Sequence, residues 1–82
     1  MPFENEDRIS VILKLVENEL RRAKALHGKF HSVHEGWAVL YEEVDELWDE
    51  VKKKTKERSQ AKLAEEAIQV AAMAARFVVD LL

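Results

Sequence analysis

The sequence predicts an all-α protein whose single domain, residues 1–82, contributes three helices to an oligomeric helical bundle. Glycine and proline are scarce, with two and one residues respectively, so the chain offers few positions for turns. Apolar residues recur every three or four positions along three segments, which is the spacing of one helix face. The composition, 48% hydrophobic and 35% charged, is typical of long amphipathic helices and too apolar for a disordered chain.

The first helix is expected over residues 6–27. Its apolar positions are three or four residues apart: Ile9, Ile12, Leu13, Val16, Leu20 and Ala23. Gly28 follows directly and can adopt the left-handed conformation that ends many helices. The pattern therefore predicts one amphipathic helix followed by a short loop.

The second helix is expected over residues 33–55. Ser32 followed by Glu35 forms a capping box, and the lysines at 52–54 place positive charge at the negative end of the helix dipole. Gly36 is unfavourable inside a helix by up to about 1 kcal/mol. We therefore expect a close approach to the backbone at this glycine, and packing against another helix is an equally good explanation.

The third helix is expected over residues 60–81, with Ser59 as its cap. It is rich in alanine and apolar on two faces, so we expect burial on two sides. A chain of 82 residues without cysteine has a small core and no disulfide to reinforce it. These two observations predict a homo-oligomer, either a dimer or a tetramer.

The charge and hydropathy of the chain exclude some classes of function. A net charge of −3 lacks the basic surface that nucleic-acid binding needs, so we expect no nucleic-acid partner. No apolar run approaches the roughly 20 residues of a membrane span, so no membrane partner is expected. The polar, acidic start does not resemble a secretion signal, and the expected location is therefore cytoplasmic.

The second helix is unusually acidic, with six carboxylates between residues 42 and 50. Asp49 and Glu50 have lysines three or four residues away, so we interpret them as ordinary surface charges. The other four acids have no such cation. Glu43 lies beside Leu47 at the margin of the apolar stripe, where a half-buried carboxylate near a like charge needs a counter-cation or a raised pKa.

A second acidic position lies on the third helix. Glu66 and Gln69 are three residues apart at the edge of the apolar stripe, as Glu43 and Glu46 are on the second helix. Antiparallel packing can bring the two pairs together, and Mg²⁺ or Mn²⁺ prefers such oxygen ligands. The residues alone leave two interpretations open, a metal site or a charged surface held by salt bridges.

Two segments resemble a known family. Residues 34–47, HEGWAVLYEEVDEL, followed by residues 65–71, EEAIQVA, are similar to the MazG-type all-α nucleoside triphosphate pyrophosphohydrolases. The signature of that superfamily is E-E-x-x-E on one helix and E-x-x-D on the next. The resemblance covers about residues 30–80. Glu42, Glu43 and Glu46 match the first motif, and Glu66 matches the second, with Gln69 where the family has Asp.

The resemblance implies a helical, oligomeric enzyme that cleaves a nucleoside triphosphate between its α and β phosphates, giving a monophosphate and pyrophosphate. It implies Mg²⁺ or Mn²⁺ as the cofactor and four metal-binding positions, Glu43, Glu46, Glu66 and Gln69. Glu42 is then a further ligand or the group that orients the attacking water. The alternative is a non-catalytic MazG-like helical oligomer or interaction module whose metal site is degenerate.

Other residues near the start of the second helix are candidate substrate contacts. His34 and Lys29 can reach a substrate, as a polar group and as a cation for phosphate. Trp37 and Trp48 lie at the edge of the apolar stripe, where core packing is the favoured interpretation. Stacking on the base is the alternative for both, and Trp37 is the candidate substrate contact.

Overall fold

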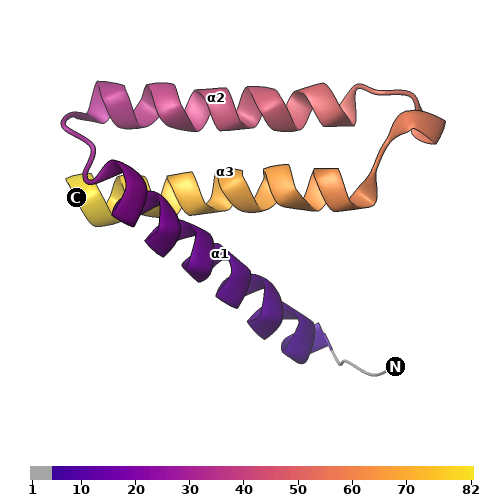
Figure 1. Ribbon diagram of the computed structural model, residues 1–82, viewed down its shortest axis with the longest axis horizontal. Helices are drawn as coiled ribbons and strands as arrows, with labels where there is room; N and C mark the ends of the chain where they lie inside the picture. Colours follow the sequence, from indigo (N-terminus) through magenta and orange to yellow (C-terminus); the bar gives the residue numbers. More distant parts are fainter. Residues whose placement is uncertain (1–4) are drawn as a thin grey trace.

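The computed structural model describes residues 5–82 and contains three α-helices and no strand over that range, which confirms the predicted all-α class and helix number. The elements are α1 (Asn5–His27), α2 (Val33–Val51), a 3₁₀ turn η1 (Thr55–Glu57) and α3 (Gln60–Leu81). Helix α3 is the central element. It runs antiparallel beside α2 and is crossed near its C-terminal end by α1, which then diverges from it (Figure 1).

The predicted helix ends are confirmed at most positions. Gly28 follows α1 with a φ of +72°, and its backbone N–H donates to the Lys24 carbonyl. The Ser32 hydroxyl accepts from the Glu35 N–H, and the Ser59 hydroxyl accepts from the Lys62 N–H, both at 3.1 Å. These bonds satisfy amide groups that have no partner within their own helix.

The predicted end of α2 at residue 55 is wrong, because the helix stops at Val51. Lys52 is the capping residue, and the chain then turns through η1. The guanidinium Nε of Arg58 donates to the Val51 carbonyl at 2.9 Å, so a side chain satisfies one of the last free carbonyls.

The core lies where the three helices meet. Its buried apolar residues are Ala23, Phe30, Ala72 and Met73, and six more apolar side chains pack partly buried against them. The radius of gyration is 14.2 Å, against about 12 Å for a compact chain of this length. Helices α1 and α2 do not pack against each other over the described residues. One side of each is therefore bare in the single chain.

The bare side of α2 overturns the prediction that Trp37 and Trp48 pack in the core. They are 59% and 55% exposed. Both lie on a stripe turned about 100° from the face that meets α3. No helix covers that stripe in the described chain, because α1 packs on α3 alone.

A buried polar group ties the C-terminal end of α3 to the other elements. The Asp80 side chain is fully buried and accepts a hydrogen bond from the Lys24 ammonium and a 3.0 Å bond from the Phe30 N–H. Arg76 lies one turn earlier, with its Nε 3.5 Å from Asp80, and donates to the Gly28 carbonyl. This Asp80 cluster (Lys24, Phe30, Arg76, Asp80) joins α1, the loop and α3.

Gly36 confirms the predicted close approach. A Cβ atom at this position would lie 2.7 Å from Phe77 Cδ2 and 2.9 Å from Leu81 Cδ1. The glycine therefore lets α2 and α3 approach more closely than alanine allows.

A Gly36→Ala substitution should lower the free energy of unfolding by about 1–2 kcal/mol, because overpacking outweighs the gain in helix propensity. Urea denaturation measures this loss. Combining it with Phe77→Leu should recover part of the loss by making room for the methyl group. A single variant more stable than the wild type would contradict the close packing.

None of the helices in the described part of the chain combines the length and the apolar character needed to cross a lipid bilayer.

Candidate metal centre

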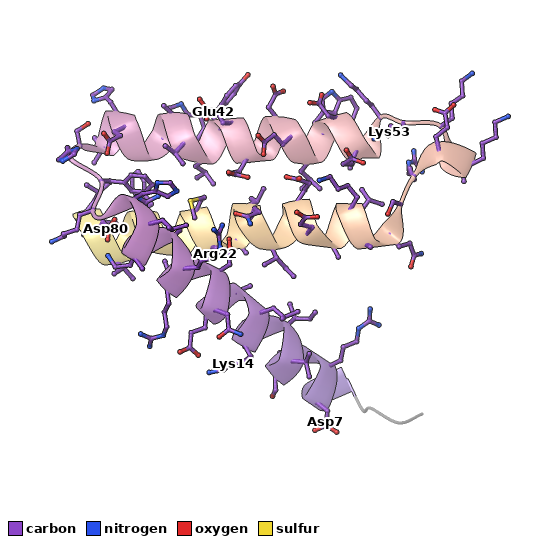
Figure 2. All side chains as sticks on the ribbon, viewed as in Figure 1. Asp7, Lys14, Arg22, Glu42, Lys53 and Asp80 are labelled. Atoms are coloured by element: carbon purple, nitrogen blue, oxygen red, sulfur yellow. The ribbon has the colours of Figure 1, made fainter. Side chains whose placement is uncertain are left out.

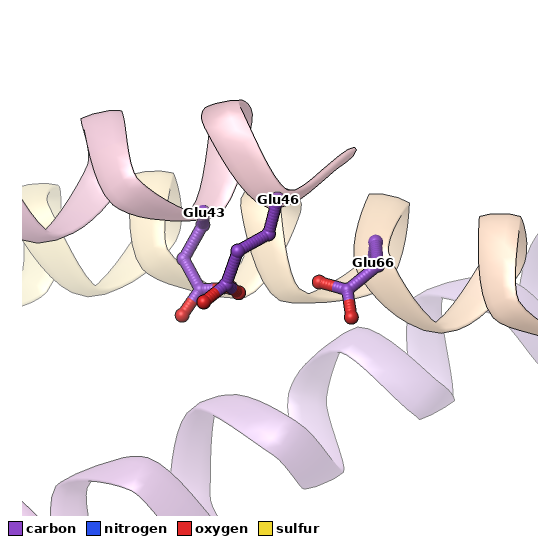
Figure 3. A group of neighbouring side chains, drawn as sticks. All are labelled: Glu43, Glu46 and Glu66. Atoms are coloured by element: carbon purple, nitrogen blue, oxygen red, sulfur yellow. The ribbon is translucent and has the colours of Figure 1, made fainter. Parts of the chain in front are cut away.

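Three carboxylates converge between α2 and α3. Glu43 and Glu46 come from one face of α2 and Glu66 comes from α3, and Figure 3 shows the three side chains directed toward one another. One carboxylate oxygen of each lies within 4.8 Å of the others. The antiparallel packing expected from the sequence therefore brings these three predicted ligands together. We call Glu43, Glu46 and Glu66 the acidic cluster.

The packing of α2 explains why the cluster is partly buried. Leu40 and Leu47 pack partly buried on the same helix, and Glu43 lies between them in the sequence. Glu43 is consequently half-buried, while Glu46 remains exposed. The position of Glu43 at the edge of the apolar stripe agrees with its predicted place.

Glu66 has one oxygen with a partner and one without. The Lys62 ammonium lies 3.6 Å from Glu66 Oε1 across one helix turn. Only 12% of the Glu66 side chain is exposed, and its Oε2 atom is buried without a hydrogen-bond partner. A buried carboxylate oxygen without a partner is costly, so this atom is suited to a ligand that supplies positive charge.

The acidic cluster changes the acidity of Glu43. Burial, followed by the charges of Glu46, Glu66 and Glu19, raises the pKa of Glu43 from 4.5 to about 7. The described residues give no ion pair to Glu42, Glu43, Asp45 or Glu46, as the sequence predicted. By contrast, Lys52 pairs with Asp49 and Lys53 with Glu50, both at 3.0 Å. Glu50 is nevertheless buried at 9% exposure, so its interpretation as ordinary surface is wrong.

The residues present fit a hard divalent cation. Three carboxylates offer only oxygen donors, and one of those oxygens is buried without a partner. Mg²⁺ and Mn²⁺ favour this donor chemistry, and both keep water molecules at the positions the protein leaves open. The geometry gives no preference between the two ions.

Gln69, the fourth predicted ligand, takes part in a contact that the sequence did not reveal. Its side-chain Nε2 donates to Glu19 Oε1 of α1 at 2.8 Å. Glu19 is held in addition by Arg22, three residues later on α1. Sequence reasoning missed Glu19, although it lies three residues after Val16 and four before Ala23, on the core-facing side of α1. A charged residue at such a position is a signal in itself.

The other predicted site residues lie away from the acidic cluster. Glu42 is exposed and lies on the side of α2 turned away from α3 (Figure 2). His34 and Trp37 are exposed on the first turns of α2. Lys29 lines a separate shallow pocket beside Phe30 and Arg76. The single chain therefore does not bring these four residues to the three carboxylates.

The raised pKa of Glu43 predicts a pH dependence of the metal-free protein. Below pH 4.5 this carboxyl is protonated in both folded and unfolded chains. Between pH 4.5 and about 7 the unfolded chain releases the proton and the folded one retains it, so stability falls as pH rises. We expect the melting temperature measured in EDTA to be lower at pH 8 than at pH 5.5.

The comparison must isolate Glu43 from the other ionisable groups of the chain. The Glu43→Gln variant keeps the histidines and removes the carboxyl, and should show a smaller fall in melting temperature between pH 5.5 and pH 8. Equal falls in both proteins would show that the acidic cluster does not hold the proton.

Comparisons of the chain with protein-family models, with curated proteins and with solved structures find no match.

Proposed function

We propose that this chain is a divalent-cation-dependent nucleoside triphosphate pyrophosphohydrolase of the MazG type, which releases a nucleoside monophosphate and pyrophosphate. The observation that carries the proposal is the convergence of Glu43, Glu46 and Glu66, with one buried oxygen of Glu66 left without a partner. These three residues are among the four positions, with Gln69 as the other, that the motif resemblance implies as ligands.

The chain's own residues would have distinct roles at such a site. Glu43, Glu46 and Glu66 would hold Mg²⁺ or Mn²⁺, which would neutralise phosphate charge and polarise the bond to be cleaved. Glu43 would give up its proton when the cation binds, because a ligating carboxylate must be ionised. Lys62, which lies beside Glu66, would be free to meet a phosphate oxygen once the cation takes its place.

A non-catalytic helical module is the second candidate, and one contact favours it. Lys62 already supplies a positive charge to Glu66, and a proton on Glu43 removes part of the remaining repulsion. In that case the acidic cluster is stable at neutral pH without a metal ion. Its function would then be to hold the helices or to bind a partner.

The test is to titrate the protein with Mg²⁺ and Mn²⁺ and to incubate it with each common ribo- and deoxyribonucleoside triphosphate. We expect a higher melting temperature at millimolar cation and the release of pyrophosphate rather than phosphate, both abolished by EDTA. A protein whose melting temperature does not respond to either cation, and which releases no pyrophosphate, would favour the non-catalytic module.

We infer in addition that the chain works as a homo-oligomer, a dimer or a tetramer. Two apolar surfaces support this. One is the stripe on α2, formed by Trp37, Tyr41, Val44 and Trp48, each 46–59% exposed. The other is the N-terminal half of α1, which diverges from α3 (Figure 1). This half has an apolar hollow lined by Ile9, Ile12 and Leu13 together with Arg8.

The amount of exposed apolar surface favours a second copy as the occupant. Only four apolar side chains are buried in the described chain, which is a small core for a stable domain. The α2 stripe has the alternating three- and four-residue spacing by which helices of two chains pack together. Covering both surfaces would supply the core that the single chain lacks.

A Leu13→Glu substitution should dissociate the oligomer, because it places a charge in the α1 surface. Leu13 is 62% exposed in the single chain, so the substitution costs little there. Light scattering coupled to size-exclusion chromatography measures the mass. The matched control is Lys14→Gln, which changes the net charge equally but at an exposed ion pair with Glu17. A monomeric wild-type protein, or a Leu13→Glu variant of unchanged mass, would contradict the inference.

A further inference from the structure

A hollow of about 350 Å³ lies where the loop between α1 and α2 meets the C-terminal part of α3 (Figure 1). Four of the side chains that line it carry or can carry a positive charge, namely His27, Lys29, His31 and Arg76. Glu35 is the only carboxylate among the described residues that line it. The hollow shares no residue with the acidic cluster, and its volume is near the lower end of the range for small-molecule sites. We call it the Arg76 hollow.

Arg76 is the most rigidly held of these cations. Its side chain is 6% exposed, and its guanidinium carbon lies 3.9 Å from the centre of the Phe30 ring. A guanidinium has five N–H donors, yet the described residues give it one oxygen acceptor within hydrogen-bond distance, the Gly28 carbonyl at 3.1 Å. The Met73 sulfur, 3.7 Å from Nη1, is a weak acceptor, and Nε has no hydrogen-bond partner. A buried cation with unused donors therefore lines the hollow.

The buried carboxylate beside Arg76 already has other partners. Asp80 accepts hydrogen bonds from the Lys24 ammonium and the Phe30 N–H, and it lies 3.5 Å from Arg76 Nε. This ion pair holds the guanidinium in place through its Nε side. It leaves the N–H groups at the far end of the guanidinium without an oxygen of Asp80.

The charges around the hollow do not balance. One Glu35 oxygen accepts from the His31 N–H at 2.8 Å, and the other lies 3.3 Å from the His31 ring. Lys29 is exposed and forms no ion pair with any of the described residues. Three permanent cations, on Lys24, Lys29 and Arg76, therefore meet two carboxylates, on Glu35 and Asp80. One positive charge is left for an anion from outside the chain.

We propose that the Arg76 hollow binds a phosphate group, either as the free ion or as part of a small phosphorylated molecule. The planar guanidinium of Arg76 matches phosphate oxygens through parallel N–H groups, and the Lys29 ammonium supplies a second charge. The imidazoles of His27 and His31 each offer an N–H donor, even in the neutral form. No metal ion and no residue of the acidic cluster takes part, so the inference does not depend on the proposed pyrophosphohydrolase.

The experiment follows the backbone amides of ¹⁵N-labelled protein by NMR during titration with inorganic phosphate, with adenosine 5′-monophosphate and with adenosine. EDTA is present throughout, so that no divalent cation can bring a phosphate to the acidic cluster. A sodium chloride titration at matched ionic strength corrects for salt effects. We expect saturable shifts at residues 27–31 with both phosphates and none with adenosine.

Lys29→Gln is the variant that tests the site, because Lys29 is exposed and its loss leaves the Asp80 cluster intact. It should raise the dissociation constant for phosphate roughly tenfold, as expected for the loss of one hydrogen bond to a charged group. Lys56→Gln is the matched control, with the same change of charge at an exposed position of η1, and should leave the constant unchanged.

Arg76→Lys keeps the charge and removes the planar fork, so it should weaken binding more than Lys29→Gln does. The amide spectrum of the phosphate-free variant shows whether this substitution preserves the fold. Lys29→Gln tests the site independently if it does not.

The comparison of probes identifies the source of the phosphate group. Tighter binding of adenosine 5′-monophosphate supports a phosphorylated molecule, and equal or tighter binding of inorganic phosphate supports the free ion. Shifts that do not saturate, or that match those with sodium chloride, would overturn the proposal. So would equal effects of Lys29→Gln and Lys56→Gln, or saturable shifts around the acidic cluster in place of residues 27–31. None of these results bears on cation binding by the acidic cluster, which the Mg²⁺ and Mn²⁺ titrations test separately.

Discussion

Replacing Glu43 by glutamine is expected to abolish divalent-cation binding and pyrophosphate release while raising the melting temperature of the metal-free protein. The substitution removes one of three carboxylate ligands, so we expect activity to fall by at least about 100-fold. It also removes the half-buried Glu43 carboxyl, whose pKa is raised to about 7 by burial and by neighbouring acids. After allowance for screening by solvent, that relief should contribute about 1 kcal/mol, or a rise of about 4–8 °C.

The matched control is Asp45→Asn. Asp45 lies on the same helix, is exposed and is not a member of the acidic cluster. It should keep both activity and the response of the melting temperature to Mg²⁺. A Glu43→Gln variant that still binds Mg²⁺ with wild-type affinity would show that the three carboxylates are not the metal site.

Replacing Asp80 by asparagine should cause the largest loss of stability in the chain. The Asp80 side chain is fully buried, accepts hydrogen bonds from Lys24 and the Phe30 amide, and forms an ion pair with Arg76, whose Nε lies 3.5 Å away. An asparagine leaves two cations without their counter-charge, and breaking a buried pair in this way costs about 3–5 kcal/mol. The melting temperature should fall by at least about 12 °C, as measured by circular dichroism.

Asp49→Asn is the corresponding control. Asp49 pairs with Lys52, but about half of each side chain is exposed, so the loss should stay below about 1 kcal/mol. Lys24→Met removes one of the two cations of the Asp80 cluster and should lower the stability by an intermediate amount. This variant tests the cluster if the Asp80→Asn protein does not fold. Similar stability of the Asp80→Asn and Asp49→Asn variants would contradict the role of the cluster.

The Asp80 cluster also contributes to the stability that is lost in acid. Burial opposes ionisation of Asp80, but the bonds from Lys24 and the Phe30 amide outweigh it and lower its pKa below the ordinary 3.8. A lowered pKa stabilises the fold above pH 3.8, and this contribution is lost as the pH falls through the folded pKa.

Much of the fold could be predicted from local sequence because local chemistry determines it. The spacing of apolar residues, the Ser32 and Ser59 caps and the conformation of Gly28 depend on residues a few positions apart. The end of α2 could not be predicted in this way, because Arg58 reaches back to the Val51 carbonyl from beyond the turn. Trp37 is exposed because α1 packs on α3 and not on α2, and this choice of partner cannot be read from a local sequence pattern.

The candidate site divides in the same way. The pair Glu43 and Glu46 follows from helical spacing, and the antiparallel turn brings Glu66 opposite. Glu19 was missed because its contact with Gln69 spans fifty positions of the chain. The Asp80 cluster was missed for the same reason, although Arg76 and Asp80 stand one turn apart in an otherwise apolar segment.

The core and the Asp80 cluster lie together at one end of the α2–α3 pair, and the polar turn at residues 52–59 lies at the other. Local unfolding begins where few apolar contacts hold the backbone, so amide hydrogens near that turn should exchange with solvent well before those around Phe30 and Ala72. The acidic cluster lies between the two ends. Local unfolding at the turn would make the acidic cluster more accessible to solvent, while the core and the Asp80 cluster at the other end stay folded.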